Sequence, residues 1–274
     1  MRWLIIVFIL WVPGLTHAQV NVEKLRSDQH EDGFSGSLGL NAAFTSGNIL
    51  FADFGTASHV EWRKNKDLVF WVLNARFAAK RTQADLLAEP NIDLWDKEAH
   101  FANLMLQHLR YNRQLSDAWW WEAFTQFEYN EFLLLDRRLI AGTGPRWSLA
   151  TGEKGGIWIG TSAMMEEERL NPDSIAPSES VQTVVLRSSS YLTTTLRGDQ
   201  WSLVTTFYMQ PQFADFSDYR MMGETSLTLK INKTLSFTVD GRIRHDTHPP
   251  VTPTGAAEVQ STDTSIKNGI KISW

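Results

Sequence analysis

Polar and apolar residues alternate along most of this chain, with the two-residue period of a β-strand. The final stretch is the clearest case, because polar or charged residues occupy one face and apolar residues the other. Its apolar face carries Thr264, Ile266, Ile270, Ile272 and Trp274. This pattern is typical of a strand whose outer face touches lipid and whose inner face lines a polar interior.

Twelve stretches with this alternation follow one another between turn signals. We expect strands at 33–45, 51–64, 68–81, 98–112, 118–131, 137–150, 156–168, 181–197, 200–213, 219–231, 234–246 and 260–274. The fourth has the weakest alternation, because apolar and polar residues mix on both of its faces. A tilted strand crosses a bilayer in about 9 to 11 residues, so the expected lengths suffice.

Short and long connections alternate along these strands. The connections at 82–97, 171–180 and 247–259 are long, whereas most of the intervening turns are short. Outer-membrane barrels have this asymmetry, with short periplasmic turns and longer outer loops. Lipid cannot hydrogen-bond the free backbone groups of an open sheet edge, so a sheet that spans the membrane must close on itself. The sequence therefore predicts an all-β fold, a transmembrane antiparallel β-barrel of about twelve strands.

Tryptophan positions provide independent support for this fold. Seven tryptophans fall near the short-turn ends of the strands and in the outward phase, where an aromatic girdle meets the membrane interface. They are Trp62, Trp71, Trp119, Trp121, Trp147, Trp201 and Trp274. Trp158 lies at the same height but in the inward phase. The alternative, a soluble lipocalin-like barrel, would not place seven tryptophans at one level of one face.

The N-terminus has the pattern of a cleaved secretory signal peptide. Arg2 precedes an apolar run at 3–12, and small residues lead to an expected cleavage after Ala18. A spanning helix needs roughly 20 apolar residues, so this run is too short for an anchor. We expect a signal peptide at 1–18, a periplasmic lead-in at 19–32 and the barrel at 33–274. Export places the protein in the outer membrane of a Gram-negative bacterium.

Composition narrows the classes of partner. The chain has no cysteine and a formal net charge of -5, so disulfides, thiolate metal sites and nucleic-acid binding are not expected. Loss of Arg2 with the signal peptide makes the balance more acidic. The expected partners are outer-membrane lipid, lipopolysaccharide and, during biogenesis, the outer-membrane assembly machinery. No cofactor is expected.

The first predicted strand and its turn resemble a known family. A glycine-rich strand at 33–45 runs into Thr45, Gly47 and Asn48, which is similar to the opening of the YdiY-like salt-induced outer-membrane proteins, domain of unknown function 481. Members commonly continue with Thr and an acidic or amide residue, where this chain has Ile49 and Leu50. The resemblance implies an outer-membrane barrel without an established biochemical activity, and it supplies no catalytic residues.

The inward phase of the predicted strands carries many charges. The expected lumen-lining residues are Arg76, Lys80, Glu122, Glu128, Arg138, Arg146, Glu166, Glu168, Arg187, Glu224, Asp240, Arg242, Arg244 and Lys267. Opposite charges at similar heights predict four cross-strand pairs, namely Glu122–Arg146, Glu166–Arg187, Glu224–Arg242 and Asp240–Lys267.

These charges allow two interpretations. They could line a narrow passive pore with at most a weak anion preference, or form a paired network that fills a non-conducting structural or envelope-stress barrel. Barrels of about 8 strands are filled by side chains and those of 16 or more hold a channel, so twelve strands leave both open.

Two further classes of function are less favoured. An outer-membrane hydrolase could use Ser188, Ser189 or Ser190 with one of the histidines His59, His100, His108, His245 and His248, but no base is predicted beside these serines. His245 and His248 lack a third ligand for a metal. Apolar residues in the loops 82–97 and 131–136 could bind a partner, fold into the barrel mouth or touch lipopolysaccharide.

Overall fold

The computed structural model describes residues 32–46, 49–89, 91–96, 99, 103–254 and 258–273. The expected signal peptide and nearly all of the expected lead-in lie outside these residues, as do His100 and Trp274. Within the described residues, no helix is long and apolar enough to cross a membrane.

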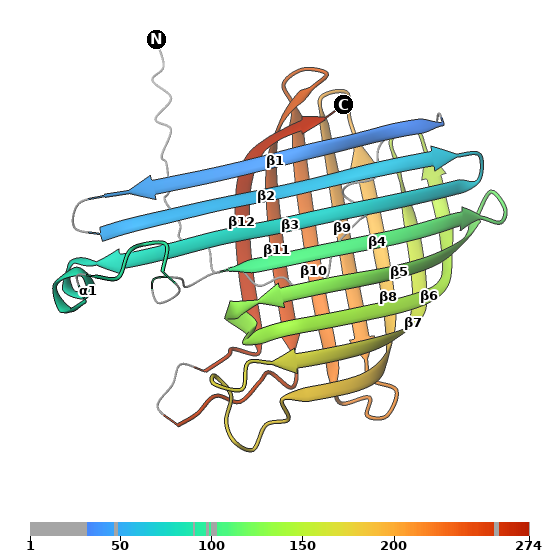
Figure 1. Ribbon diagram of the computed structural model, residues 1–274. Helices are drawn as coiled ribbons and strands as arrows, with labels where there is room; N and C mark the ends of the chain where they lie inside the picture. Colours follow the sequence, from blue (N-terminus) through green and yellow to red (C-terminus); the bar gives the residue numbers. More distant parts are fainter. Residues whose placement is uncertain are drawn as a thin grey trace, which may run out of the picture.

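The described chain forms a closed antiparallel barrel of twelve strands, as the alternation predicts. The strands are β1 (Gly33–Thr45), β2 (Ile49–Lys64), β3 (Asp67–Thr82), β4 (Leu104–Gln114), β5 (Trp119–Asn130), β6 (Leu135–Gly152), β7 (Gly155–Leu170), β8 (Gln182–Arg197), β9 (Trp201–Pro211), β10 (Tyr219–Lys230), β11 (Leu235–Asp246) and β12 (Thr262–Ser273). Each pairs with its neighbour in sequence, and β12 returns to β1. Figure 1 shows β1 to β5 side by side in front of β9 to β12, with the two walls crossing at a steep angle.

The register between neighbouring strands is long and mostly continuous. β2 and β3 pair from Ile49 and Thr82 down to Lys64 and Asp67, where Asn65 begins a two-residue turn. Asn65 has a positive φ of 53°, which asparagine tolerates and such hairpin turns require. We call the end of the barrel that carries these short connections the turn end, and the opposite end the loop end.

The barrel is apolar outside and polar inside. The outward phase exposes large apolar side chains, for example Phe34 at 73 % and Val184 at 62 %. The inward phase holds buried charged residues, including Glu128, Arg138 and Glu166. A water-soluble protein has the reverse arrangement, so this distribution is that of a membrane-spanning barrel.

β4 is shorter than predicted and shifted, running from Leu104 to Gln114 rather than over 98–112. Its inward face begins with the buried apolar residues Leu104 and Leu106 and continues with His108 and Arg110. Apolar residues therefore lie on both faces of its first half. The polarity pattern could not separate the faces there, which is why its boundaries were wrong.

The connection expected as a plain loop at 82–97 contains the helix α1 (Gln83–Ala88). Thr82 and Asp85 form a reciprocal capping box at its start. The segment then folds against the outer wall, where Leu94 is buried with Ala52 and Ala79. A 3₁₀ turn (Glu131–Leu133) follows β5.

Candidate functional site

The interior charges at the loop end form one connected set of ion pairs. We call it the lumen lattice; its members are Glu128, Arg138, Glu166, Glu168, Arg187, Arg220, Arg244 and Asp246. Arg138 contacts Glu128 at 3.2 Å and Glu168 at 2.5 Å. Both pairs join adjacent strands, as the alternating phase of β5, β6 and β7 requires.

Arg220 carries the lumen lattice across the barrel interior. Its guanidinium lies 2.7 Å from Glu166 and 3.1 Å from Glu168 on β7, and 2.8 Å from Asp246 on the neighbouring β11. β8 and β9 separate β7 from β10 in the barrel wall. The contacts therefore pass through the lumen in front of β8 and β9, and the side chains of Arg220, Glu166 and Asp246 are buried there.

A second buried cluster lies nearer the turn end. Tyr191 on β8 donates a hydrogen bond of 2.7 Å to Glu122 on β5, crossing two intervening strands. Gly160, opposite Tyr191 in the register, leaves room for its ring, because a Cβ there would collide with it. Arg110 and Arg146 contact Glu122 at 3.5 Å and 3.9 Å. This cluster also fills the interior.

The rest of the interior is more open. The inward phase of β1 and β2 has small residues at its middle, and Ala43 and Ala57 are exposed although they face inward. Four charges that face inward here are only half-buried, namely Asp240 and Arg242 on β11 and Lys267 and Lys271 on β12. We call this face the open wall, and define it by Gly39, Ala43, Gly55, Ala57, Asp240, Arg242, Lys267 and Lys271. It is the water-accessible side of the described lumen.

Most charges expected to line the lumen are buried in the structure. They are Arg76, Glu122, Glu128, Arg138, Arg146, Glu166, Arg187, Glu224 and Arg244. Glu168, Asp240, Arg242 and Lys267 are half-buried, and Lys80 is exposed at the loop end of β3. Arg76 is paired with Asp53, its Nε lying 2.8 Å from Oδ1.

Three of the four predicted cross-strand pairs form ion pairs in the structure. Glu122 lies 3.9 Å from Arg146 and Glu166 lies 3.4 Å from Arg187. Glu224 and Arg242 are also in contact. The fourth pair, Asp240 and Lys267, stands directly opposite in the β11–β12 register.

Sequence reasoning missed Arg110, Arg220 and Asp246 as interior charges. Arg220 shares the phase of Glu224, and Asp246 shares the phase of Arg244, so alternation alone could have identified both. Nothing in the sequence indicated that Arg220 reaches across to β7, because that contact depends on the curvature of the whole barrel.

The described tryptophans of the expected girdle all follow the outward phase near the turn end. Trp71, Trp119, Trp121 and Trp201 are 39 % to 45 % exposed, while Trp62 and Trp147 are half-buried. Trp119 and Trp147 pack edge to face with ring centroids 4.4 Å apart. Trp158 lies inside, beneath the Arg146 guanidinium at 5.3 Å, which accounts for its inward phase.

Two of the candidate nucleophiles make hydrogen bonds to residues other than histidine. Ser189 is buried and accepts a hydrogen bond of 3.0 Å from Gln210, whereas Ser190 faces outward and bonds Thr161. A serine–histidine contact that the sequence did not suggest joins Ser37 to His59 at 2.7 Å, but both residues are buried. In the described part of the chain, no three His, Asp or Glu residues are arranged to hold a metal.

Among known structures, several outer-membrane proteins resemble the chain at low identity. The NanC porin is 9 % identical, with 88 % of this chain and 98 % of that chain covered and a TM-score of 0.46. The translocator domain of the autotransporter NalP from Neisseria meningitidis is 9 % identical, with 92 % and 91 % covered and a TM-score of 0.43. The KdgM porin is 8 % identical, with 88 % and 99 % covered and a TM-score of 0.40. Likenesses this distant carry no argument about activity.

No curated protein sequence matches the chain. The family described as "Protein of unknown function, DUF481" matches residues 70–274, which include ten of the twelve strands in whole or nearly so. The suspected family is thereby confirmed from a region separate from the 33–48 motif that first suggested it. The chain belongs to the DUF481 family.

Proposed function

We propose that the protein is an outer-membrane barrel with a narrow passive route for small ions and solutes along the open wall. The observation that carries this proposal is the contrast between two sides of one lumen. The cluster around Glu122 and all of the lumen lattice except the half-buried Glu168 are buried, whereas the residues of the open wall are exposed or half-buried. A charged, wetted face bounded by packed side chains is what a narrow aqueous path requires.

Placement in the outer membrane is supported by the outer surface. Apolar side chains are exposed around the barrel wall, and tryptophans gather near the turn end, where interfacial rings favour the headgroup level. Membrane lipid and lipopolysaccharide would then contact this surface. The expected signal peptide and the assembly machinery belong to the same export route. We include no catalytic role in this proposal.

The charges of the open wall set the expected selectivity. This wall has three basic residues, Arg242, Lys267 and Lys271. The acidic residues beside them are Asp240 and Glu224, the partner of Arg242, so there is a small excess of positive charge. Rings of side-chain charge bias which ions pass. We therefore expect at most a weak preference for anions, and a strong cation preference would contradict this assignment.

Single-channel recording in a planar bilayer tests the proposal. The wild-type protein should give small, voltage-independent conductance steps. Ala57→Trp places a ring in the open wall and should remove most of this conductance. Ser58→Trp is the matched control, because the next residue of β2 faces outward and its ring would point into lipid. Equal conductance in both variants would show that ions do not follow the open wall.

A filled structural barrel is the second candidate, and the lumen lattice is the observation that favours it. Arg220 links β7, β10 and β11 through buried contacts, so it braces strands that are not neighbours in the barrel wall. In this case the wild-type protein would be silent in the bilayer at every voltage. Its role would be mechanical, as a rigid element of the envelope.

A further inference from the structure

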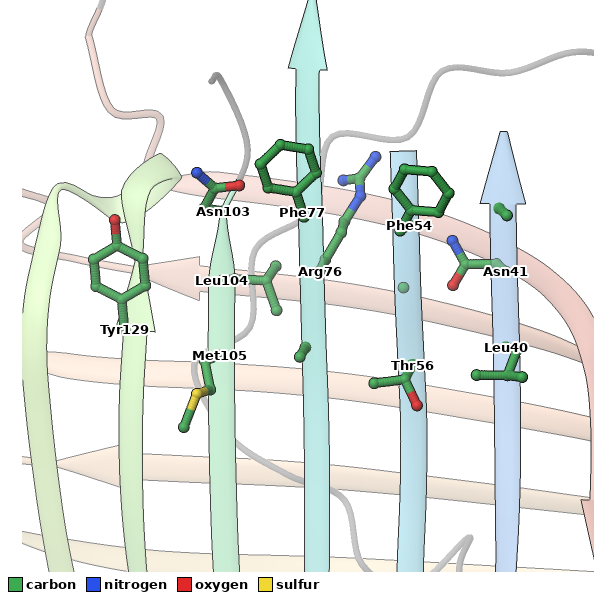
Figure 2. Close-up of a pocket in the computed structure, with 13 residues that line it drawn as sticks. Leu40, Asn41, Phe54, Thr56, Arg76, Phe77, Asn103, Leu104, Met105 and Tyr129 are labelled. Atoms are coloured by element: carbon green, nitrogen blue, oxygen red, sulfur yellow. The ribbon is translucent and has the colours of Figure 1, made fainter. Parts of the chain in front are cut away.

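An apolar groove runs along the outer wall of the barrel at its loop end. It has a volume of about 880 Å³, within the range of roughly 300–1,000 Å³ seen for small-molecule pockets. Figure 2 shows the side chains that line it on successive strands from β5 to β1, which include Tyr129, Met105, Phe77, Phe54 and Leu40. All five follow the outward phase, so the groove opens to the membrane side.

The connection after α1 covers the loop end of this groove. Trp95 stacks on Phe77 with ring centroids 5.5 Å apart and on Phe54 at 6.5 Å. Leu94 is buried against Ala52 and Ala79. These two residues are each two positions nearer the loop end than Phe54 and Phe77. This connection therefore packs on two of the side chains that line the groove.

The groove reaches β1 where the barrel wall is least completely paired. Among the described residues, the β1–β12 register runs from Ser37 with Ser273 to Leu40 with Ile270 and ends there. Both strands continue further, β1 to Thr45 and β12 back to Thr262. Figure 1 shows β12 crossing behind β1 and the tip of β1 extending beyond it. We call this part of the β1–β12 junction, from Leu40 towards the loop end, the seam.

An opening in a membrane-facing wall needs polar partners, because lipid tails cannot satisfy strand edges. Asn41 lies beside the seam with its amide packed over Gly55; any larger residue at 55 would collide with that amide. Lys267 and Lys271 face inward from β12 and are half-buried. The inner side of the seam thus presents an amide and two cationic side chains to the open wall.

We propose that the groove holds the hydrocarbon chain of a single-chain anionic amphiphile, a fatty acid, whose carboxylate enters the seam towards Asn41, Lys267 and Lys271. The groove supplies apolar contact over the length of a chain, and burial of each methylene is favourable. The two lysines supply charge complementary to a carboxylate. A two-chain phospholipid has a second chain that the single groove does not accommodate.

Binding in the groove is tested with spin-labelled stearic acid and the protein in phosphatidylcholine vesicles. The wild-type protein should immobilise the labelled acid more strongly than spin-labelled phosphatidylcholine, which reports ordinary boundary lipid. Ala75→Trp fills the groove and should weaken the apparent affinity at least about tenfold, or ~1.4 kcal/mol. Ala141→Trp adds the same ring to the outer face of β6, away from the groove, and should change nothing. Equal immobilisation of acid and phospholipid, or equal effects of the two variants, would overturn the proposal.

The absence of cysteine allows the seam to be tested separately. Leu38→Cys with Ile272→Cys joins register partners and should form a disulfide readily. Ala42→Cys with Asn268→Cys would be partners only if the pairing continued, and should oxidise much more slowly. Closing the second pair with a bifunctional thiol reagent should abolish immobilisation of the acid. Rapid oxidation of the second pair would rule out the seam. Neither readout depends on conductance, so fatty-acid binding by a silent barrel would reject the pore and retain this inference.

Discussion

Replacement of Arg220 by methionine removes the cation that joins β10 to the non-neighbouring strand β7 through the lumen lattice. Its guanidinium contacts Glu166, Glu168 and Asp246 at 2.7, 3.1 and 2.8 Å, and its side chain is only 10 % exposed. Methionine has a similar length and no charge. The variant therefore leaves the barrel wall intact. It removes the one cation that three neighbouring carboxylates share.

The magnitude follows from the burial of this site. Removal of one partner from a buried ion pair typically costs about 3–5 kcal/mol, because the remaining charge stays buried without compensation. Arg138 and Arg244 remain near these carboxylates and limit the loss. We expect Arg220→Met to lower the free energy of unfolding by about 4 kcal/mol, within that range.

Urea unfolding of the protein in vesicles, followed by tryptophan fluorescence, measures this change. Arg113→Met is the control, because Arg113 pairs with Asp67 at 2.8 Å and its side chain is 53 % exposed. Exposed ion pairs contribute about 0–1 kcal/mol. If Arg220→Met were as mild as Arg113→Met, water would be screening the site, and the account of a sealed lumen lattice would be wrong.

Three other results are expected. Arg81→Ala should release the connection after β3 and expose it to added protease, because Arg81 donates hydrogen bonds to three carbonyls of that segment, at 2.7–2.9 Å. The Thr82 backbone N–H holds the pKa of Asp85 below its usual value, so the capping box is stable at neutral pH; the protection factors of the α1 amides, which correct for the pH dependence of intrinsic exchange, should fall only as the pH falls through that lowered pKa. Gly144→Val should reduce the yield of heat-resistant folded barrel on gels, since its Cβ would collide with the Thr161 backbone, whereas Gly241→Val, whose Cβ would meet nothing, should not.

The two-residue period predicted the barrel because each strand contacts two different media. Alternation in β11 and β12 is strict, and both were expected within two residues of their observed bounds. β4 was misplaced because Leu104 and Leu106 pack inside, where the pattern required polar residues. Polarity alternates in a strand because one face contacts lipid and the other contacts water. Where the inner face contacts packed side chains instead of water, it can be apolar too, and the alternation is lost.

The candidate site was predictable only in its adjacent pairs. Glu166 with Arg187 follows from phase and height on neighbouring strands. The contact of Arg220 with Glu166 does not, because β8 and β9 lie between them in the wall. The division of the lumen into a packed and an open side likewise depends on the volumes of side chains from all the strands together. The residue pattern of a single strand does not contain this information.

Cysteine accessibility tests the central claim, a membrane barrel whose interior is sealed on one side and wet on the other. Ala57→Cys and Ser189→Cys each place one thiol facing inward, on the open wall and in the packed interior respectively. With the protein in vesicles, a small charged thiosulfonate reagent should modify Cys at 57 rapidly and Cys at 189 very slowly. Equal rates at both positions would contradict the account, whether both thiols reacted or neither did.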